Sequence, residues 1–286
     1  QSYLQPGFQD LFSQDHLPID VIISPELEVG KAVLRRLAVP GAFDILNFAD
    51  GKVSVVGVTL EEDCPIVNTP LRQLTDLFPD LKSRVVGIVR NGELFVPQSD
   101  DPMLVGDEAY FAADVRDVRR TLGIFGHEEV AARRVIIVGA GNIGLHVAHE
   151  LETNHPGTRV KLIERDREKA VQAADRLKRS IVLHGDGLDP ELLQEAGISE
   201  TETLITLTNN DQANILSCVV AKREGCQRTM ALINNNTYEP LMRSLGIDAF
   251  INPRSATVST VLQHVRRGRI RGLQSVRDGA AEVIEA

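Results

Sequence analysis

The feature that most constrains the fold of this chain is an apolar run that ends in a glycine-rich turn, Arg133 to Gly144, with the sequence RRVIIVGAGNIG. Gly139 permits a sharp turn out of a strand, Gly141 lets a pyrophosphate approach the backbone, and Gly144 lets the next helix pack closely on the sheet. The start of that helix offers free N–H groups and the positive end of its dipole to phosphates. The pattern predicts a dinucleotide-binding βαβ unit.

An acidic residue follows at the spacing that such a unit requires. Twenty residues after Gly144, the apolar run RVKLIE ends at Glu164, whose carboxylate can accept hydrogen bonds from a ribose diol. A tight turn in another kind of α/β domain would account for the glycines alone. The order strand, turn, helix, strand, acid favours the dinucleotide site.

Composition and charge narrow the class of protein. With 286 residues, 43% hydrophobic and 25% charged, the chain has the composition of a soluble globular protein of two or three compact units. Its net charge of −9 argues against a nucleic-acid partner. Cys64, Cys218 and Cys226 show neither metal-type spacing nor a disulfide framework, which favours a cytoplasmic location. No apolar stretch reaches the ~20 residues that span a bilayer, so we expect any membrane association to go through a partner protein.

Other reactive-looking residues have simpler interpretations. His146 and His149 lie at helical i, i+3 spacing but lack a third ligand nearby, so we expect no metal site. The basic run Arg266 to Gly272 falls where a linker should lie and is interpreted as solvated. Asp186 follows a glycine in a βα loop, where a helix cap or a ribose contact is more common than a catalytic acid. We predict no catalytic residues.

The chain also repeats itself over a long interval. Ile19 to Pro25 (IDVIISP) parallels Ile247 to Pro253 (IDAFINP), an offset of 228 residues that also pairs Val33 with Val261. A period of this length repeats whole domains rather than solenoid units. We therefore expect a fragment of a longer protein, which starts near the end of one nucleotide-binding unit and stops early in a later small domain.

The order of predicted elements gives the domain organisation. Residues 1–40 are expected to be the remnant of a first nucleotide-binding lobe, with a strand at Ile19–Ser24 followed by a helix. This helix either caps its own sheet, which its periodicity favours, or crosses to a partner subunit. Residues 41–118 are expected to form a small α+β lobe with a hairpin turning at Asn91-Gly92, and residues 119–132 a linker. Residues 133–265 alternate strand and helix and end in a crossover helix, and 266–286 begin a second, truncated small lobe. The predicted fold class is α/β: a doubly wound, parallel, Rossmann-like sheet with small α+β lobes in a tandem repeat.

Several motifs resemble the RCK family, also called KTN, of regulators of potassium conductance. They are VIIVGAGNIG, KLIE, HGDGLDPELLQEAGI, ITLTNNDQANI and GIDAFINPRSATVSTVLQHV, with TPLRQL, VVGIVRNGELFVP and the Gly106-Asp107 turn in the small lobe. The resemblance implies tandem copies of a nucleotide-binding lobe and a small lobe, assembled into dimers or tetramers. It implies a regulatory subunit that acts at the inner face of the membrane on a potassium-transporting partner.

The same resemblance assigns the ligand contacts. They fall on one rim, at Gly139, Ala140, Gly141, Asn142, Ile143, Gly144, Glu164, Gly185, Asp186, Thr208 and Asn209. Many members carry an arginine where this chain has Leu232, which serves a triphosphate less well than a dinucleotide. NAD(H) is therefore the favoured ligand, with ATP and ADP left open. The alternative function is an NAD-dependent dehydrogenase, which would need a proton-transfer residue beside the nicotinamide.

Overall fold

The structure is a computed structural model that describes residues 22–129, 131–265, 272–276 and 281–285. The first half of the expected strand Ile19–Ser24 lies outside these ranges, and Ile22–Ser24 are not in a strand. Most of the basic run, residues 266–271, also lies outside them. Within the described residues, no helix combines the length and the apolar character needed to cross a bilayer.

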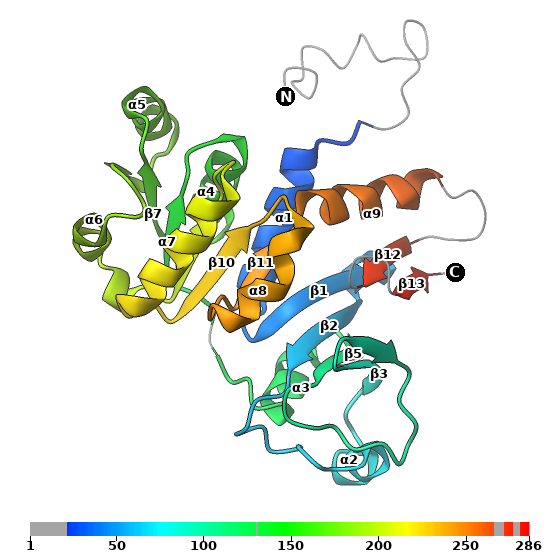
Figure 1. Cartoon of the computed structure of the whole chain (residues 1–286). Coiled ribbons are helices and arrows are strands. Elements are labelled where there is room, and N and C mark those ends of the chain that lie inside the picture. The colour runs from blue at the N-terminus through cyan, green and yellow to red at the C-terminus, as the bar shows by residue number, and fades with distance from the viewer. Residues whose placement is uncertain (1–21, 130, 266–271, 277–280, 286) are drawn as a thin grey trace, which may run out of the picture.

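The larger lobe is built on a six-stranded parallel sheet (Figure 1). Its strands are β6 (Arg134–Val138), β7 (Arg159–Glu164), β8 (Ile181–His184), β9 (Thr203–Thr206), β10 (Arg228–Leu232) and β11 (Ala249–Ile251). They lie in the order β11-β10-β9-β6-β7-β8, and each neighbouring pair is parallel. The winding reverses between β6 and β9, which confirms the doubly wound, Rossmann-like fold.

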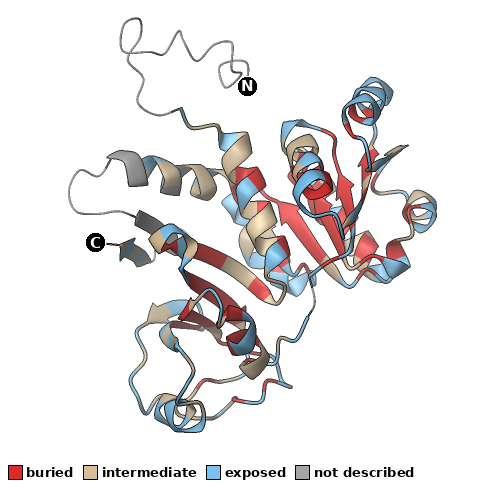
Figure 2. Ribbon diagram, turned by 180° about the vertical axis from the view of Figure 1, so that it is seen from behind, coloured by how far each residue is buried: buried red, intermediate tan, exposed pale blue. Residues whose placement is uncertain are grey.

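Alternation along β6 explains why helices cover both faces of this sheet. Val135 and Ile137 point into one core, and Ile136 and Val138 into the other, as expected for a strand buried on both sides. Figure 2 shows these strands buried between partly exposed helices. The lobe's helices are α4 (Asn142–Asn154), α5 (Arg167–Arg176), α6 (Pro190–Glu195), α7 (Asp211–Arg223), α8 (Glu239–Ser244) and α9 (Pro253–Val265), with 3₁₀ turns η4 (Ile198–Glu200) and η5 (Asn236–Tyr238).

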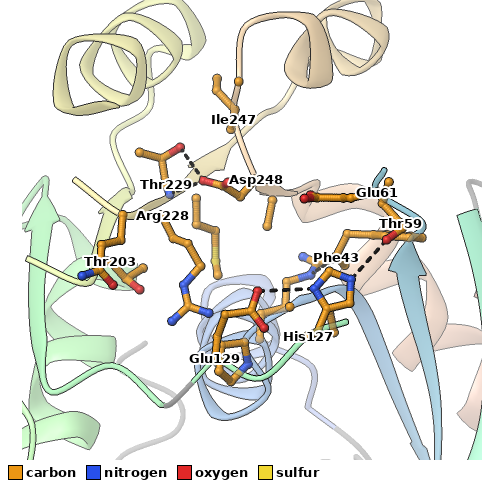
Figure 3. A pocket seen from close by; sticks show the side chains of 18 of the residues that line it. Phe43, Thr59, Glu61, His127, Glu129, Thr203, Arg228, Thr229, Ile247 and Asp248 are labelled. Atoms are coloured by element: carbon orange, nitrogen blue, oxygen red, sulfur yellow. Dashed lines mark hydrogen bonds and ion pairs between the residues drawn. The ribbon is translucent and has the colours of Figure 1, made fainter. Parts of the chain in front are cut away.

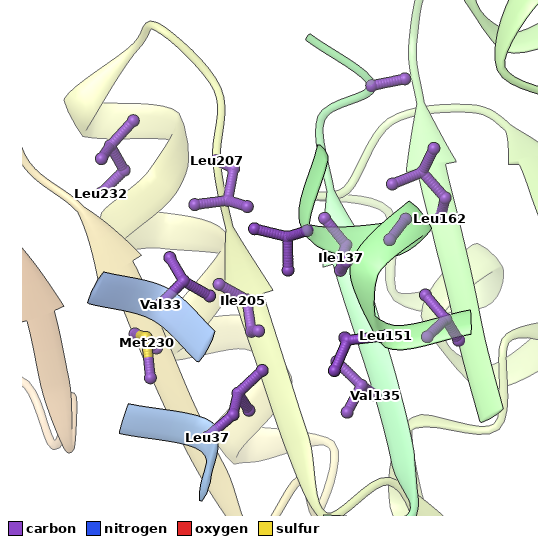
Figure 4. Close-up of a cluster of buried hydrophobic side chains, with 14 of the residues drawn as sticks. Val33, Leu37, Val135, Ile137, Leu151, Leu162, Ile205, Leu207, Met230 and Leu232 are labelled. Atoms are coloured by element: carbon purple, nitrogen blue, oxygen red, sulfur yellow. The ribbon is translucent and has the colours of Figure 1, made fainter. Parts of the chain in front are cut away.

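Among the residues that the structure describes, helix α1 (Pro25–Ala38) packs on this sheet and not on one that precedes it in the chain. Its buried residues Val29, Val33 and Leu37 belong to the same core as Ile137 and Ile205, and Figure 4 shows Val33 and Leu37 beside β9 and β10. The expectation that α1 caps the sheet of its own repeat is therefore wrong. An amphipathic stripe shows that a helix buries one face, but it does not identify the surface that covers it.

The small lobe is a five-stranded antiparallel sheet with two short helices. Its elements are β1 (Ala42–Phe48), 3₁₀ turn η3 (Ala49–Gly51), β2 (Val53–Thr59), α2 (Leu71–Leu77), β3 (Ser83–Arg90), β4 (Glu93–Phe95), β5 (Glu108–Asp114) and α3 (Val118–Ile124), and the strand order is β1-β2-β5-β3-β4. The predicted hairpin turn at Asn91-Gly92 is confirmed, since both residues have positive φ, 51° and 88°. This is the two-residue turn that suits the strand twist and that Asn-Gly favours.

The segment predicted as a linker is not one over its first half. Helix α3 and the residue that follows it place Val118, Leu122 and Phe125 in the small lobe's main core, and the ring of Phe125 stacks on that of Phe111 at 5.3 Å. The glycines Gly123 and Gly126 suggested a flexible segment. Gly126 adopts φ +89° and ends the helical segment. This glycine therefore marks the end of a helix and does not indicate a linker.

The opposite face of the small-lobe sheet is partly covered by a hairpin from the end of the described chain. Strands β12 (Gly272–Val276) and β13 (Ala281–Glu285) pair antiparallel, and Figure 1 shows them beside β1. Ala281 and Val283 pack against a buried cluster that includes Leu46 and Phe48, and the Ala49 N–H donates to Glu285 Oε2 at 2.8 Å. The hairpin thus lies against the first small lobe.

Candidate nucleotide-binding site

The glycine loop has the geometry that each glycine position requires. Gly139 leaves β6 with φ +107°, and a Cβ there would lie 3.1 Å from the Leu207 carbonyl group. A Cβ on Gly144 would collide with the carbonyl oxygen of Gly139, so α4 packs at a distance that only glycine allows. Gly141 caps α4, and no atom lies within 4 Å of a Cβ built on it. The loop is therefore tight where it packs and open where a phosphate would approach.

Glu164 holds this loop in place. Its Oε2 accepts the Ala140 N–H at 2.7 Å, and its Oε1 accepts the Asp166 N–H at 2.9 Å. The carboxylate lies at the end of β7, next to the loop that follows β6. Each oxygen has further acceptor capacity, so the same group can also meet a ribose hydroxyl.

The loop after β9 is fixed by a buried amide that the sequence reasoning missed. Asn214 is fully buried in α7; its Oδ1 accepts the Thr208 hydroxyl at 2.6 Å, and its Nδ2 donates to the Leu232 carbonyl at 2.8 Å. It thereby joins the ends of β9 and β10 at the rim. The only signal in the sequence is an amide on the apolar side of a helix, which is uncommon unless the amide is satisfied internally.

These loops surround a cavity of about 740 Å³ at the carboxyl ends of the strands. All the predicted site residues line it except Ala140, which is a buried residue of the glycine loop, and Gly144, which lies inside α4. Asp186 Oδ1 accepts the Leu188 N–H at 3.0 Å within the loop, whereas the residue that caps α6 is Asp189, so the helix-cap interpretation of Asp186 is wrong. The cavity lies at the point where the strand order reverses, which is where sheets of this kind bind ligands.

The cavity has a wall that the sequence reasoning did not assign. Pro25, Glu26 and Val29 of α1 line it, and Pro253 at the start of α9 lines it as well. Pro25 and Pro253 occupy equivalent positions in the repeat. The repeat could therefore have indicated that the helices starting at these residues face the same site. Acidic side chains also outnumber basic ones around the cavity, with Glu26, Glu164, Asp166 and Asp186 against Arg165 and Lys169.

A second, larger cavity of about 1230 Å³ lies between the two lobes (Figure 3). His127 lines this cavity, and its ring connects Thr59 with Glu129: Nε2 lies 3.1 Å from the Thr59 carbonyl oxygen, and Nδ1 lies 3.3 Å from Glu129 Oε1. This cavity meets the amino ends of β9 and β10, near Thr203 and Arg228. It is therefore at the opposite edge of the sheet from the glycine loop, and none of the predicted site residues lines it.

The two histidines of α4 contact other residues of the chain. The ring of His146 fills the space above Gly30 of α1, where a Cβ would collide with it. His149 Nδ1 lies 3.1 Å from the Thr153 hydroxyl. Among the residues that the structure describes, no group of three or more His, Cys, Asp or Glu side chains is arranged to hold a metal ion.

Comparison with known proteins agrees with this architecture. Residues 135–253 match the model of the TrkA-N domain, and residues 55–126 match that of the TrkA-C domain. The chain belongs to the TrkA-N/TrkA-C family. The resemblance to RCK proteins is thereby confirmed, and the TrkA-C match includes the α3 segment that was predicted as a linker.

Relatives of this family are matched over nearly the whole of this chain. A Trk system potassium uptake protein TrkA from Azorhizobium caulinodans is 55% identical over 286 residues, which is all of this chain and 62% of the relative. A protein of the same name from Halomonas elongata is 40% identical and is matched over 96% of this chain and 60% of its own length. This chain thus spans about three-fifths of the length of these relatives.

Solved structures show the same fold at low sequence identity. The RCK domain of GsuK superposes with a TM-score of 0.60 at 18% identity, covering 91% of this chain and 55% of GsuK. The GsuK channel bound to NAD superposes with a TM-score of 0.54 at 16% identity, covering 84% of this chain and 42% of GsuK.

Proposed function

We propose that this chain is the nucleotide-sensing part of a regulatory subunit that binds NAD(H) and controls a potassium-transporting membrane protein. The observation that carries the proposal is the cavity at the carboxyl edge of the sheet, where the open backbone of Gly141 and the start of α4 face the carboxylate of Glu164. Backbone N–H groups at a helix start bind phosphate, and an acid at the end of the second strand binds ribose.

The chemistry around the cavity favours a dinucleotide over ATP and ADP. Leu232 is buried and lines the cavity where an arginine would be needed to reach a further phosphate. The excess of carboxylates disfavours ligands with high negative charge. The NAD-bound state of GsuK shows that a protein with this fold can accept the dinucleotide.

The relatives' names support a partner that moves potassium across the membrane, because they are potassium uptake proteins. In this proposal the subunit is cytoplasmic and forms a dimer or tetramer. It reaches the inner face of the membrane through its partner. Hydride transfer is the less favoured role, since the described residues that line the cavity include no histidine, tyrosine or cysteine for proton transfer.

The binding step is tested with Gly141→Val. The branched side chain would occupy the space of the pyrophosphate, so calorimetric titration with NAD⁺, NADH, ADP and ATP should lose at least tenfold in affinity while the fold is retained. Gly157→Val is the matched control, because Gly157 also has open space around it and lies outside the cavity. Unchanged binding by Gly141→Val would show that the ligand sits elsewhere.

The regulatory step needs the complete subunit with its membrane partner. Potassium uptake by reconstituted transporter should change when NAD⁺ or NADH is added, and the complete subunit with Gly141→Val should not respond. Catalytic oxidation or reduction of a small substrate would favour the dehydrogenase instead.

A further inference from the structure

A carboxylate from outside the βαβ unit lies at the phosphate end of the nucleotide cavity. Glu26 belongs to the first turn of α1 and lines the cavity together with Asn142, the first residue of α4. The site's phosphate-binding elements are the glycine loop and the start of α4. Glu26 therefore lies where the phosphates of a bound nucleotide would be.

Packing fixes α1 in this position. Val29 and Val33 are buried in the core of the nucleotide lobe, and Gly30 lies directly against the ring of His146 on α4. On the other side, Glu28 Oε2 accepts the Thr260 hydroxyl of α9 at 3.0 Å. The Glu26 carboxylate cannot leave the cavity without a rotamer change or movement of a packed helix.

Glu26 is ionised at neutral pH. The backbone N–H of Glu26 and the Ser24 hydroxyl, which donates at 2.9 Å, lower the pKa of this carboxyl below its ordinary value, and the side chain of Asn142 acts in the same direction. The carboxylate is half-buried, so water screens its charge only partly.

We propose that Glu26 sets the charge preference of the site by disfavouring nucleotides with several negative charges at the phosphates. NAD⁺ and NADH carry one charge on each phosphate, whereas ADP and ATP carry an additional terminal charge that would approach the Glu26 carboxylate. Repulsion between like charges in a partly desolvated cavity is strong enough to change relative affinity by an order of magnitude. This inference rests on the proposed nucleotide-binding function and assigns its selectivity to a helix of the preceding repeat.

The test compares NAD⁺, ADP and ATP binding by calorimetry in EDTA, so that no divalent cation offsets the phosphate charge. Glu26→Gln keeps the shape and removes the charge; ATP affinity should rise about tenfold relative to NAD⁺, and the gain should shrink in high salt. Glu28→Gln is the control, since it removes an equivalent charge from the same helix turn at a side chain that does not line the cavity.

The outcomes separate the two proposals. An unchanged ATP-to-NAD⁺ affinity ratio in Glu26→Gln, a fall in ATP affinity, or an equal gain in Glu28→Gln would overturn the role of Glu26. Failure of the unmodified chain to bind any of the three nucleotides would overturn the proposed function itself, and the inference with it.

Discussion

At the scale of single residues, we propose two roles for the Glu164 carboxylate. It accepts the N–H groups of Ala140 and Asp166, which holds the glycine loop against β7, and it faces the cavity where a ribose would lie. A Gln at this position keeps only one acceptor oxygen, so both the loop contacts and the ligand selectivity should change.

We expect the unmodified chain to bind NAD(H) more tightly than NADP(H), because Glu164 would repel a 2′-phosphate. Glu164→Gln should reduce this preference several-fold, with Glu168→Gln, an exposed acid on α5, as the control. Arg165 is close enough to soften the preference. Titration of both cofactors measures it, and equal affinities in the unmodified chain would contradict the assignment.

Glu152 is a residue whose protonation matters for stability rather than for binding. Its side chain is 6% exposed and accepts the N–H groups of Lys178, Arg179 and Ser180. Burial would raise the pKa of this carboxyl, but the backbone donors outweigh burial and hold the pKa below its ordinary value.

Because the folded-state pKa of Glu152 is lowered, its contribution to stability is present above the unfolded pKa of about 4.3 and is lost as pH falls. Glu152→Gln should lower the free energy of unfolding by about 2 kcal/mol at pH 7, and the deficit should shrink at pH 4. Urea denaturation at both pH values tests this, with Glu150→Gln as the control. A deficit that does not depend on pH would indicate lost packing instead.

At the scale of elements, α9 has an apolar stripe that its own lobe does not cover completely. Val258 and Val261 are 49% and 39% exposed, although Ala256 packs against the lobe's core. Leu262 is half-buried, and the side chain of Val265 lies outside the described residues. This apolar stripe of α9 is therefore partly available to another chain.

We predict a dimer or tetramer at micromolar concentration, weakened by Val261→Asp with Leu262→Asp, because charge would enter an apolar contact. Val258→Asp with Val261→Asp tests the same stripe at its two exposed positions. This variant should disturb folding less than one that changes the half-buried Leu262. Val171→Asp, at an equally exposed valine of α5, is the control. Light scattering gives the mass; a monomeric unmodified chain would refute the prediction.

At the scale of the whole molecule, the two helices related by the repeat lie side by side. Helix α1 packs against both α4 and α9, and Glu28 joins it to Thr260. The lobes also touch where Arg243 of α8 donates to the Gly106 carbonyl at 3.4 Å and lies 3.8 Å from Glu108. The two lobes are thus held together by side-chain contacts as well as by the chain itself.

Nucleotide binding should saturate near one dinucleotide per chain. Among the described residues, one segment, Arg134–Glu164, has a strand, a glycine loop, a helix and an acid in the arrangement of a dinucleotide site. The described residues that line the interlobe cavity include no equivalent loop. Calorimetric titration gives the stoichiometry. Two ligands per chain, one of them retained in Gly141→Val, would show that the interlobe cavity binds nucleotide.

The sequence alone determined the features that depend on local chemistry. Glycines at positions 139, 141 and 144 fix the loop because only glycine tolerates its turn and its close packing, and Asn91-Gly92 fixes a hairpin because both residues accept positive φ. The alternation of strands and helices over residues 133–265 predicted the parallel sheet, and most of the predicted site residues lie at its carboxyl edge.

Only the tertiary structure decided which surface each amphipathic segment covers. The stripe on α1 gave no sign that the helix would cover β9 and β10, and the glycines near α3 concealed that Leu122 and Phe125 complete the small-lobe core. Glu26 could not be assigned to the nucleotide cavity from its neighbours in the sequence, because its position depends on packing more than a hundred residues away. Hydrophobic burial is non-directional, so a sequence specifies that an apolar face is buried, whereas the folded chain selects the partner that buries it.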